Sequence, residues 1–176
     1  MTPEDFSYYW EHRNSVMVRA LANRIYQQER QRKMEFREAA IKVVSLVSGS
    51  AAFATLPSIA SATLGSHIPA IAGAVVVLAT TCSLVFGFAA KARDAAKRAT
   101  EWAMLDRDIH AVGPQDFTAE QVNHWAARCN EIEAGEPAPN HLLFQRSYER
   151  ACEAIGSTPS KVSSKFSRFM PVILIP

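Results

Sequence analysis

The sequence predicts an all-α protein: a two-helix transmembrane hairpin between a long N-terminal helix and a C-terminal region of cytosolic helices. Residues 43–90 contain no Asp, Glu, Lys or Arg, and His67 is their only ionisable side chain. Charged residues are dense on both sides of this run. A helix on the surface of a soluble protein needs a polar face, so a long uncharged stretch is typical of membrane spans. Apart from the short apolar run 172–175, no stretch has a strand pattern.

Residues 1–42 are expected to form a cytosolic, juxtamembrane helix. Thr2 can cap this helix, Pro3 suits its first turn, and the two carboxylates that follow complement the positive end of the helix dipole. No glycine or further proline interrupts the segment. Apolar residues recur at loose helical spacing, which predicts one long helix, or two in series, packed on a partner.

Residues 43–90 are expected to form the transmembrane hairpin, with spans at about 43–64 and 68–90. As helices, both spans would be about 33 Å long, enough to cross a hydrocarbon core about 30 Å thick. Six basic residues flank the outer ends of the hairpin, and none lies between the spans: Arg37, Lys42, Lys91, Arg93, Lys97 and Arg98. The positive-inside rule then places both termini in the cytoplasm. A soluble bundle with two buried central helices is the alternative interpretation.

The linker between the spans suits a tight turn on the far side of the membrane. Gly65 tolerates unusual backbone angles, Ser66 can cap the second helix, and Pro69 fits its first turn. His67 prefers the wet interface to the bilayer core.

Small residues form a row at i, i+4 spacing on each expected span. The rows are Ser50, Ala54, Ser58 and Ala62 on the first span, and Ala79, Ser83 and Gly87 on the second. Such rows allow helix backbones to approach closely. They either hold the hairpin together or, for one row, pack between the protomers of a homo-oligomer. Pro57 is expected to kink the first span.

Residues 91–176 are expected to form the cytosolic helical region. Gly113-Pro114 ends a first helix, and Thr118 with Gln121 makes a capping box for a second that runs to about Ala134. Asn140 can cap a third helix over 141–155, which Gly156 ends. The apolar tail 170–176 is too short to span a bilayer.

The composition argues against several classes of function. Nineteen basic against 17 acidic residues give no drive toward nucleic acid. Three cysteines without C-x-x-C spacing fit a reducing compartment, and no signal peptide is visible. No catalytic motif, phosphate loop or metal-ligand spacing occurs, so neither an enzyme nor a cofactor is expected.

Three segments carry a family resemblance: "EFREAAIKVV" (35–44), "FAAKARDAAKRATEWAMLDRDI" (88–109) and "EAGEPAPNHLLFQRSYERACEA" (133–154). With the hairpin between them, they resemble the SLATT-domain family of bacterial two-span membrane proteins. The likeness rests on architecture and leaves the segments before 14 and after 156 uncovered.

The resemblance implies a pore-forming effector of a bacterial anti-phage or conflict system, in the inner membrane. Such an effector oligomerises and permeabilises the bilayer when a separate sensor or nucleotide-signalling protein triggers it, so that the infected cell dies (abortive infection). Arg146 and Arg150, four apart on one helix, are a candidate contact for an anionic ligand, with a solvated helix face as the alternative. A phage holin-like lysis protein and a non-lytic helical adaptor are the other interpretations.

Overall fold

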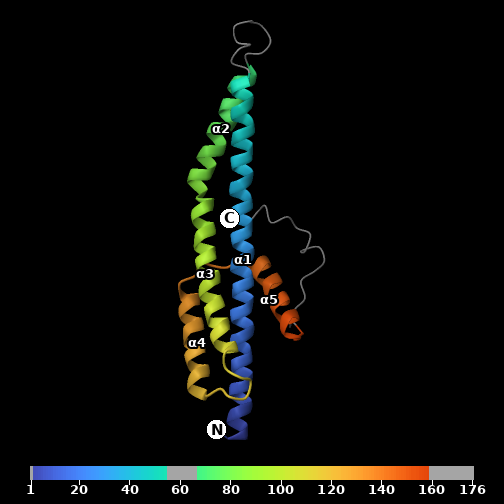
Figure 1. The fold of residues 1–176 in the computed structure, drawn as a ribbon, viewed down its shortest axis with the longest axis vertical. Coiled ribbons are helices and arrows are strands. Elements are labelled where there is room, and N and C mark those ends of the chain that lie inside the picture. The colour runs from blue at the N-terminus through green and yellow to red at the C-terminus, as the bar shows by residue number, and fades with distance from the viewer. Residues whose placement is uncertain (1, 55–66, 159–176) are drawn as a thin grey trace. The chain divides into compact units, whose positions relative to one another are not determined.

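The computed structural model describes residues 2–54 and 67–158, and five helices make up most of this part of the chain (Figure 1). They are α1 (Pro3–Ala54), α2 (His67–Phe86), α3 (Phe88–His110), α4 (Ala119–Ala134) and α5 (His141–Ile155). No strand occurs among the described residues. The all-α class expected from the sequence is therefore confirmed.

The chain divides into two compact units, which are described separately below. Unit 1 comprises Met1–Glu29 and Ala95–Pro176, and unit 2 comprises Arg30–Asp94. Because the unit boundaries lie inside α1 and α3, each of these helices contributes residues to both units.

The predicted signal for the start of α1 is confirmed. The helix begins at Pro3, and the backbone N–H of Asp5 donates to the Thr2 hydroxyl over 3.2 Å. The Asp5 carboxylate in turn accepts from the Thr2 backbone N–H over 3.0 Å. The Thr2 hydroxyl donates to the same carboxylate over 2.6 Å, and this bond together with the one from the Thr2 backbone lowers the pKa of Asp5. Reciprocal bonds of this kind satisfy amides that the first helical turn leaves without partners.

The predicted ends of α4 and α5 are also confirmed. Thr118 and Gln121 form the expected capping box of α4, and Asn140 caps α5 by accepting from the Leu143 backbone N–H over 3.0 Å. Gly156 ends α5 in the left-handed region, with φ of 78°. The Ser157 N–H then bonds the Cys152 carbonyl over 2.9 Å, as in a Schellman-type ending.

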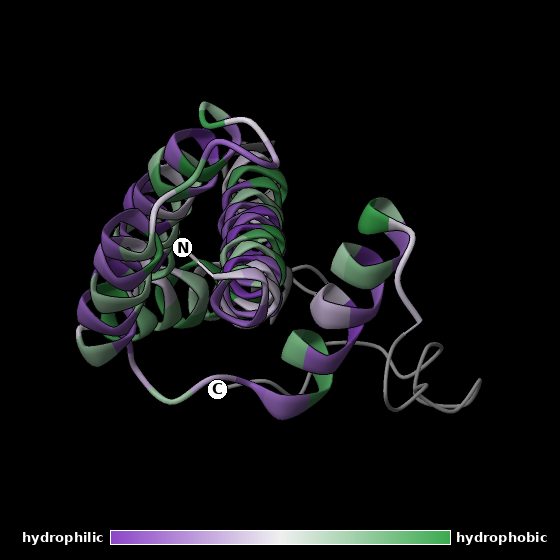
Figure 2. Cartoon of the chain, turned by 90° about the horizontal axis from the view of Figure 1, so that it is seen from below, coloured by the Kyte–Doolittle hydropathy of each residue, from purple (hydrophilic) through white to green (hydrophobic). Residues whose placement is uncertain are grey.

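The core of unit 1 lies where α4 packs against α1 and α3. Trp102 and Ile109 are fully enclosed, and Trp125 and Cys129 meet them from α4. The complete cluster is Val16, Ala20, Trp102, Leu105, Ile109, Phe117, Val122, Trp125, Cys129 and Ile132. Figure 2 shows hydrophilic and hydrophobic residues alternating along α4 and α5, as in helices with one buried side.

Unit 2 consists of the second half of α1, all of α2 and the first turns of α3. In Figure 1, α2 runs back alongside α1. The expected span 68–90 is divided at Gly87, where α2 ends and α3 begins. Gly87 has φ of 55°, a conformation that residues with a Cβ rarely adopt. Helical bonds continue across the break, from Gly87 N–H to the Ser83 carbonyl and from Lys91 N–H to the Gly87 carbonyl.

One stretch among the described residues, Gly73–His110, is long and apolar enough to cross a membrane, and none of its most apolar part is buried. Length and composition alone make this a weak indication. The first expected span, 43–64, falls partly on residues 55–66, outside the described part of the chain.

Candidate functional site

Large apolar side chains are exposed along unit 2. On α1, Leu46 is 71% exposed, and on α2, Val85 is 74% exposed. The complete set in unit 2 is Phe36, Val43, Val44, Leu46, Val47, Ile71, Val77, Leu78, Val85 and Phe86. A water-soluble protein rarely exposes a continuous apolar surface of this kind without a partner to cover it.

Within the uncharged run, the half-buried side of each helix in unit 2 carries many small residues. On α1 these are Ser45, Ser48 and Gly49, beside Ile41. On α2 they are Gly73, Ala79 and Ser83, beside Val75 and Val76. Small residues therefore make up much of the inner side of unit 2, whereas most of its large apolar residues point away from it.

This distribution is the reverse of the one in unit 1. Water drives large apolar side chains inward, because their burial there contributes about 1.5–3 kcal/mol each. In a bilayer that drive is absent, and helices associate through small residues that allow close packing. Exposed large apolar residues with small residues on the inner side are typical of helices that pack within a bilayer.

The predicted small-residue rows fall on both kinds of surface. Ala79 and Ser83 are half-buried on α2, and Gly87, which is also half-buried, follows the end of this helix. Ser50 lies on the exposed side of α1, and its hydroxyl donates to the Leu46 carbonyl over 2.8 Å. Ala54 ends α1, but the structure does not describe its side chain. Two residues of the first row, Ser58 and Ala62, lie outside the described residues.

The predicted turn falls mostly outside the described part of the chain. Gly65 and Ser66 belong to the segment 55–66, as does Pro57. His67 begins α2 and Pro69 lies in its first turn, where proline is tolerated because that N–H has no helical partner. The structure does not describe the side chains of His67 and Pro69.

Charged residues reappear where the apolar faces of unit 2 end. On α1, Lys42 pairs with Glu38 over 2.6 Å, one turn before the uncharged run. The Arg37 guanidinium lies 5.9 Å from the centre of the Phe88 ring, at the start of α3. A boundary between apolar and charged residues, with aromatic and basic side chains at the boundary, is typical of a membrane–water interface.

The predicted anion-contact pair lies in a hollow of mixed charge. Arg146 and Arg150 line it together with Glu149 and Glu153. Arg150 also pairs with Glu29 of α1 over 2.6 Å. The neighbouring carboxylates offset the positive charge that an anionic ligand would need, and the Glu29 pair already engages one guanidinium.

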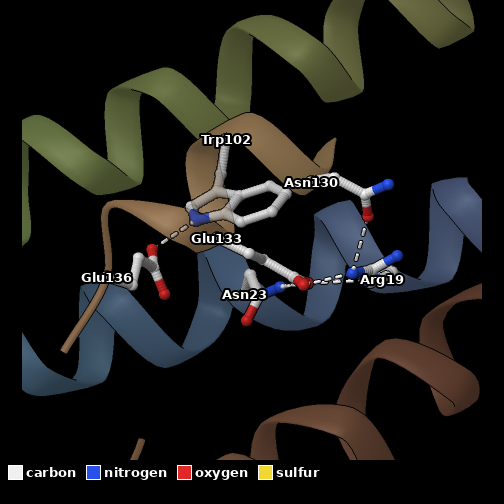
Figure 3. Close-up of polar contacts among 6 residues, drawn as sticks. All are labelled: Arg19, Asn23, Trp102, Asn130, Glu133 and Glu136. Atoms are coloured by element: carbon white, nitrogen blue, oxygen red, sulfur yellow. Dashed lines mark hydrogen bonds and ion pairs between the residues drawn. The ribbon is translucent and has the colours of Figure 1, made fainter. Parts of the chain in front are cut away.

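A network of polar contacts, the polar seam, joins α1 to the C-terminal end of α4 within unit 1 (Figure 3). Arg19 donates to both carboxylate oxygens of Glu133, over 2.6 Å from Nε, and to Asn130 over 3.1 Å. Asn23 donates to Glu133 over 3.2 Å. The hydrogen bond to Glu133 raises the pKa of Arg19. A fork of two bonds from arginine to carboxylate fixes orientation as well as charge.

The seam continues to Glu136, in the loop after α4. One Glu136 oxygen accepts from the Trp102 indole N–H over 2.7 Å and from the Gln27 side-chain amide over 2.9 Å. Arg98 donates to the Gly135 carbonyl over 2.7 Å. These contacts connect α1, α3 and the end of α4, and no short sequence motif could predict them because Gln27 and Glu136 are 109 residues apart.

Arg13 ties α1 to the C-terminal end of α3. Its guanidinium donates to the carbonyls of Ile109 and Val112 over 3.1 and 3.2 Å. It also lies 5.7 Å from the ring centres of Trp10 and Phe117. Burial lowers the pKa of Arg13. A cation is favourable here because the last carbonyls of a helix carry partial negative charge.

Within the described residues, no group of three or more His, Cys, Asp or Glu side chains could hold a metal ion. His124 is exposed on α4, whereas Cys129, five residues on, is buried. Burial raises the pKa of the Cys129 thiol to about 11, which makes it a poor nucleophile at neutral pH.

Comparisons with family models, curated proteins and solved structures find no match for this chain. The function must therefore be argued from the chain's own residues and contacts.

Proposed function

We propose that this protein is a membrane effector whose unit 2 inserts into the bilayer as a helical hairpin and assembles there into homo-oligomers. On activation the assembly permeabilises the membrane, the activity that the SLATT resemblance implies for a bacterial anti-phage system. The surface of unit 2, with ten large apolar side chains exposed and many small residues on its inner side, carries the proposal.

The length of α2 supports the insertion. Its residues His67–Phe86 extend about 30 Å as a helix, which matches the thickness of the hydrocarbon core. Basic residues follow directly on α3, starting at Lys91, and favour the cytoplasmic side. This orientation places unit 1, which has its own core, in the cytoplasm of the cell, where a separate sensor could reach it.

The small-residue face of α2 supports close helix packing. Ser83 and its neighbours one turn away let two backbones approach, and hydroxyls across such contacts contribute about 0.6–2 kcal/mol each. The exposed face, which includes Thr81 and Cys82, is left for lipid or for a neighbouring protomer.

Expression in bacteria with a voltage-sensitive dye tests the effector directly. We expect the chain in the membrane fraction, and we expect loss of membrane potential under overproduction or phage infection. A normal potential in both conditions, with the chain in the membrane, contradicts the permeabilising activity. A chain found in the aqueous fraction without detergent contradicts the insertion itself.

Two leucine substitutions on α2 give a matched pair. Ser83→Leu puts a bulky side chain on the half-buried face, and Thr81→Leu puts the same side chain on the exposed face. We expect Ser83→Leu to abolish depolarisation and Thr81→Leu to retain it. Equal activity of the two variants would rule out the small-residue face as the packing surface.

A non-lytic membrane adaptor is the second candidate, favoured by the complete hydrophobic core of unit 1, which can present a binding surface without a pore. Insertion with an unchanged membrane potential would select this function. A holin-like role fits less well because unit 1 accounts for much of the chain, and an adjacent endolysin gene would argue for it.

A further inference from the structure

Unit 1 contains an open groove between α1 and α5 that the proposed membrane activity does not use. It has a volume of about 490 Å³, within the range of binding pockets. Val18 and Ala22 line it from α1, and Phe144, Tyr148 and Cys152 line it from α5. Polar residues complete its wall: Asn14, Ser15, Arg19, Glu133 and Ser157.

Two contacts hold α5 to α1, one at the start of α5 and one, the Arg150–Glu29 pair, in its second half. At the start of α5, the Asn140 N–H donates to the Tyr26 hydroxyl over 3.0 Å, and the Phe144 ring packs edge-on against Tyr26. Farther along, α5 diverges from α1 toward its C-terminal end (Figure 1).

The chain leaves α5 at the edge of this groove. Gly156 turns the backbone through its left-handed conformation, and Ser157, the next residue, lines the groove. The described chain ends one residue later, at Thr158, with residues 159–176 still to follow. A segment tethered at the groove has a high effective concentration there, on the order of millimolar for short flexible linkers.

The sequence that follows has the composition to fill an apolar groove. Residues 170–176, Met-Pro-Val-Ile-Leu-Ile-Pro, carry no charged side chain, and their two prolines disfavour a helix. Residues 158–169 can extend to about 40 Å, so the apolar segment can reach back along α5. It is also too short to cross a bilayer by itself.

We propose that the groove between α1 and α5 is the intramolecular docking site of residues 170–176. Val172, Ile173 and Leu174 bury their side chains against the α1 and α5 walls, and the docked segment closes the gap that α5 leaves. The proposal is independent of membrane insertion, because every residue of the groove belongs to unit 1.

Cysteine cross-linking in the full-length chain tests the docking. In a background of Cys82→Ser and Cys152→Ser, the second because Cys152 lines the groove, Ser15→Cys on the groove rim is combined with Ile173→Cys, and a short bis-maleimide is added. Cys129 is buried in the native protein. The matched control combines Ile173→Cys with Asn123→Cys, an exposed position on α4 that does not line the groove.

We expect intramolecular cross-links to form about tenfold faster from Ser15→Cys than from Asn123→Cys, because docking raises the local concentration only at the groove. Equal rates would contradict the proposal. Cross-linked dimers would show that the groove binds the tail of a second copy and would contradict intramolecular docking. Protection of Ile173→Cys from maleimide only when lipid vesicles are added would show that the tail binds the membrane instead.

A groove variant checks the same inference without changing the tail. Val18→Arg places a charge in the groove, and Val18→Leu keeps it apolar. We expect the arginine variant to lose the Ser15–Ile173 cross-link and the leucine variant to keep it. Circular dichroism of both variants confirms that the helices remain, and an unchanged cross-link in Val18→Arg would overturn the docking.

Discussion

The two units of this chain distribute their residues in opposite ways. Unit 1 encloses Trp102 and Ile109 completely and leaves four large apolar side chains exposed among its described residues, namely Tyr8, Met104, Leu142 and Ile155. Unit 2 exposes ten, and Met34 and Ala92 are the buried residues in its described part. Under the proposed function, this contrast reflects two solvents, water around unit 1 and lipid around unit 2.

Long-range polar bonds such as Arg19–Glu133 and Arg24–Asp106 join the helices of unit 1. Hydroxyls bond carbonyls one turn back in both units, from Thr100 and Ser147 in unit 1 and from Ser50 and Thr80 in unit 2. In a bilayer such local bonds would satisfy the hydroxyls of unit 2, because no water is available there to pair with them.

The largest expected effect is on the core of unit 1. Trp102→Ala removes an enclosed indole and its bond to Glu136, and should lower the free energy of unfolding by about 3–5 kcal/mol. Urea denaturation followed by circular dichroism measures this loss. A change below about 1 kcal/mol would contradict the packing described for unit 1.

A charge placed at an exposed apolar position should have different effects in the two units. Val77→Arg on α2 should cost about 2.5–3.5 kcal/mol of membrane insertion, because the residue lies near the middle of the proposed span. Met104→Arg, at a similarly exposed position in unit 1, should change stability by about 0.5 kcal/mol or less. Fractionation and urea denaturation measure the two effects, and a harmless Val77→Arg would argue for water around unit 2.

Replacing each of the two glycines with positive φ by alanine should lower stability by different amounts. Gly156→Ala should cost about 1–2 kcal/mol, because the turn that ends α5 holds this residue in the left-handed region. Gly87→Ala should cost less, since helix continues on both sides and the backbone can relax into one straight helix. Thermal denaturation compares the two variants, and a larger loss for Gly87→Ala would mean that the break is held by its surroundings.

The native cysteines give the mildest test. In intact membranes at pH 8, none of the three should react quickly with a water-soluble maleimide. Cys129 stays protonated because burial raises its pKa to about 11, and Cys82 would face lipid. Mass spectrometry of the labelled chain checks this, and rapid labelling of Cys82 would place that helix face in water.

Local sequence was sufficient for the helical class and for most helix ends. Thr2, Thr118, Asn140 and Gly156 act where their side chains or backbone freedom predict, because a cap depends on a few neighbouring residues. The uncharged run and its basic flanks likewise required nothing beyond the sequence. The break at Gly87 was not predicted, since a glycine in a helical pattern is compatible with a continuous helix.

The candidate site was only partly predictable. The row Ala79, Ser83 and Gly87 follows from spacing alone, but the half-buried positions on α1 are Ser45, Ser48 and Gly49, whereas the spacing pointed to Ser50. Which of several small-residue faces turns inward depends on the rotation of one helix against another, and spacing does not determine that rotation.

The sequence by itself determined that this protein is helical, where most helices start and end, and that one segment is free of charge. Tertiary structure decided which faces meet. Arg19 bonds Glu133 across 114 residues of sequence. The Tyr26 hydroxyl accepts from the Asn140 N–H, at the start of α5, across the same sequence separation. Caps and charge exclusion act within a turn or two of chain, whereas contacts between helices depend on how whole helices pack. For that reason the groove beside α5 could be identified only in the folded chain.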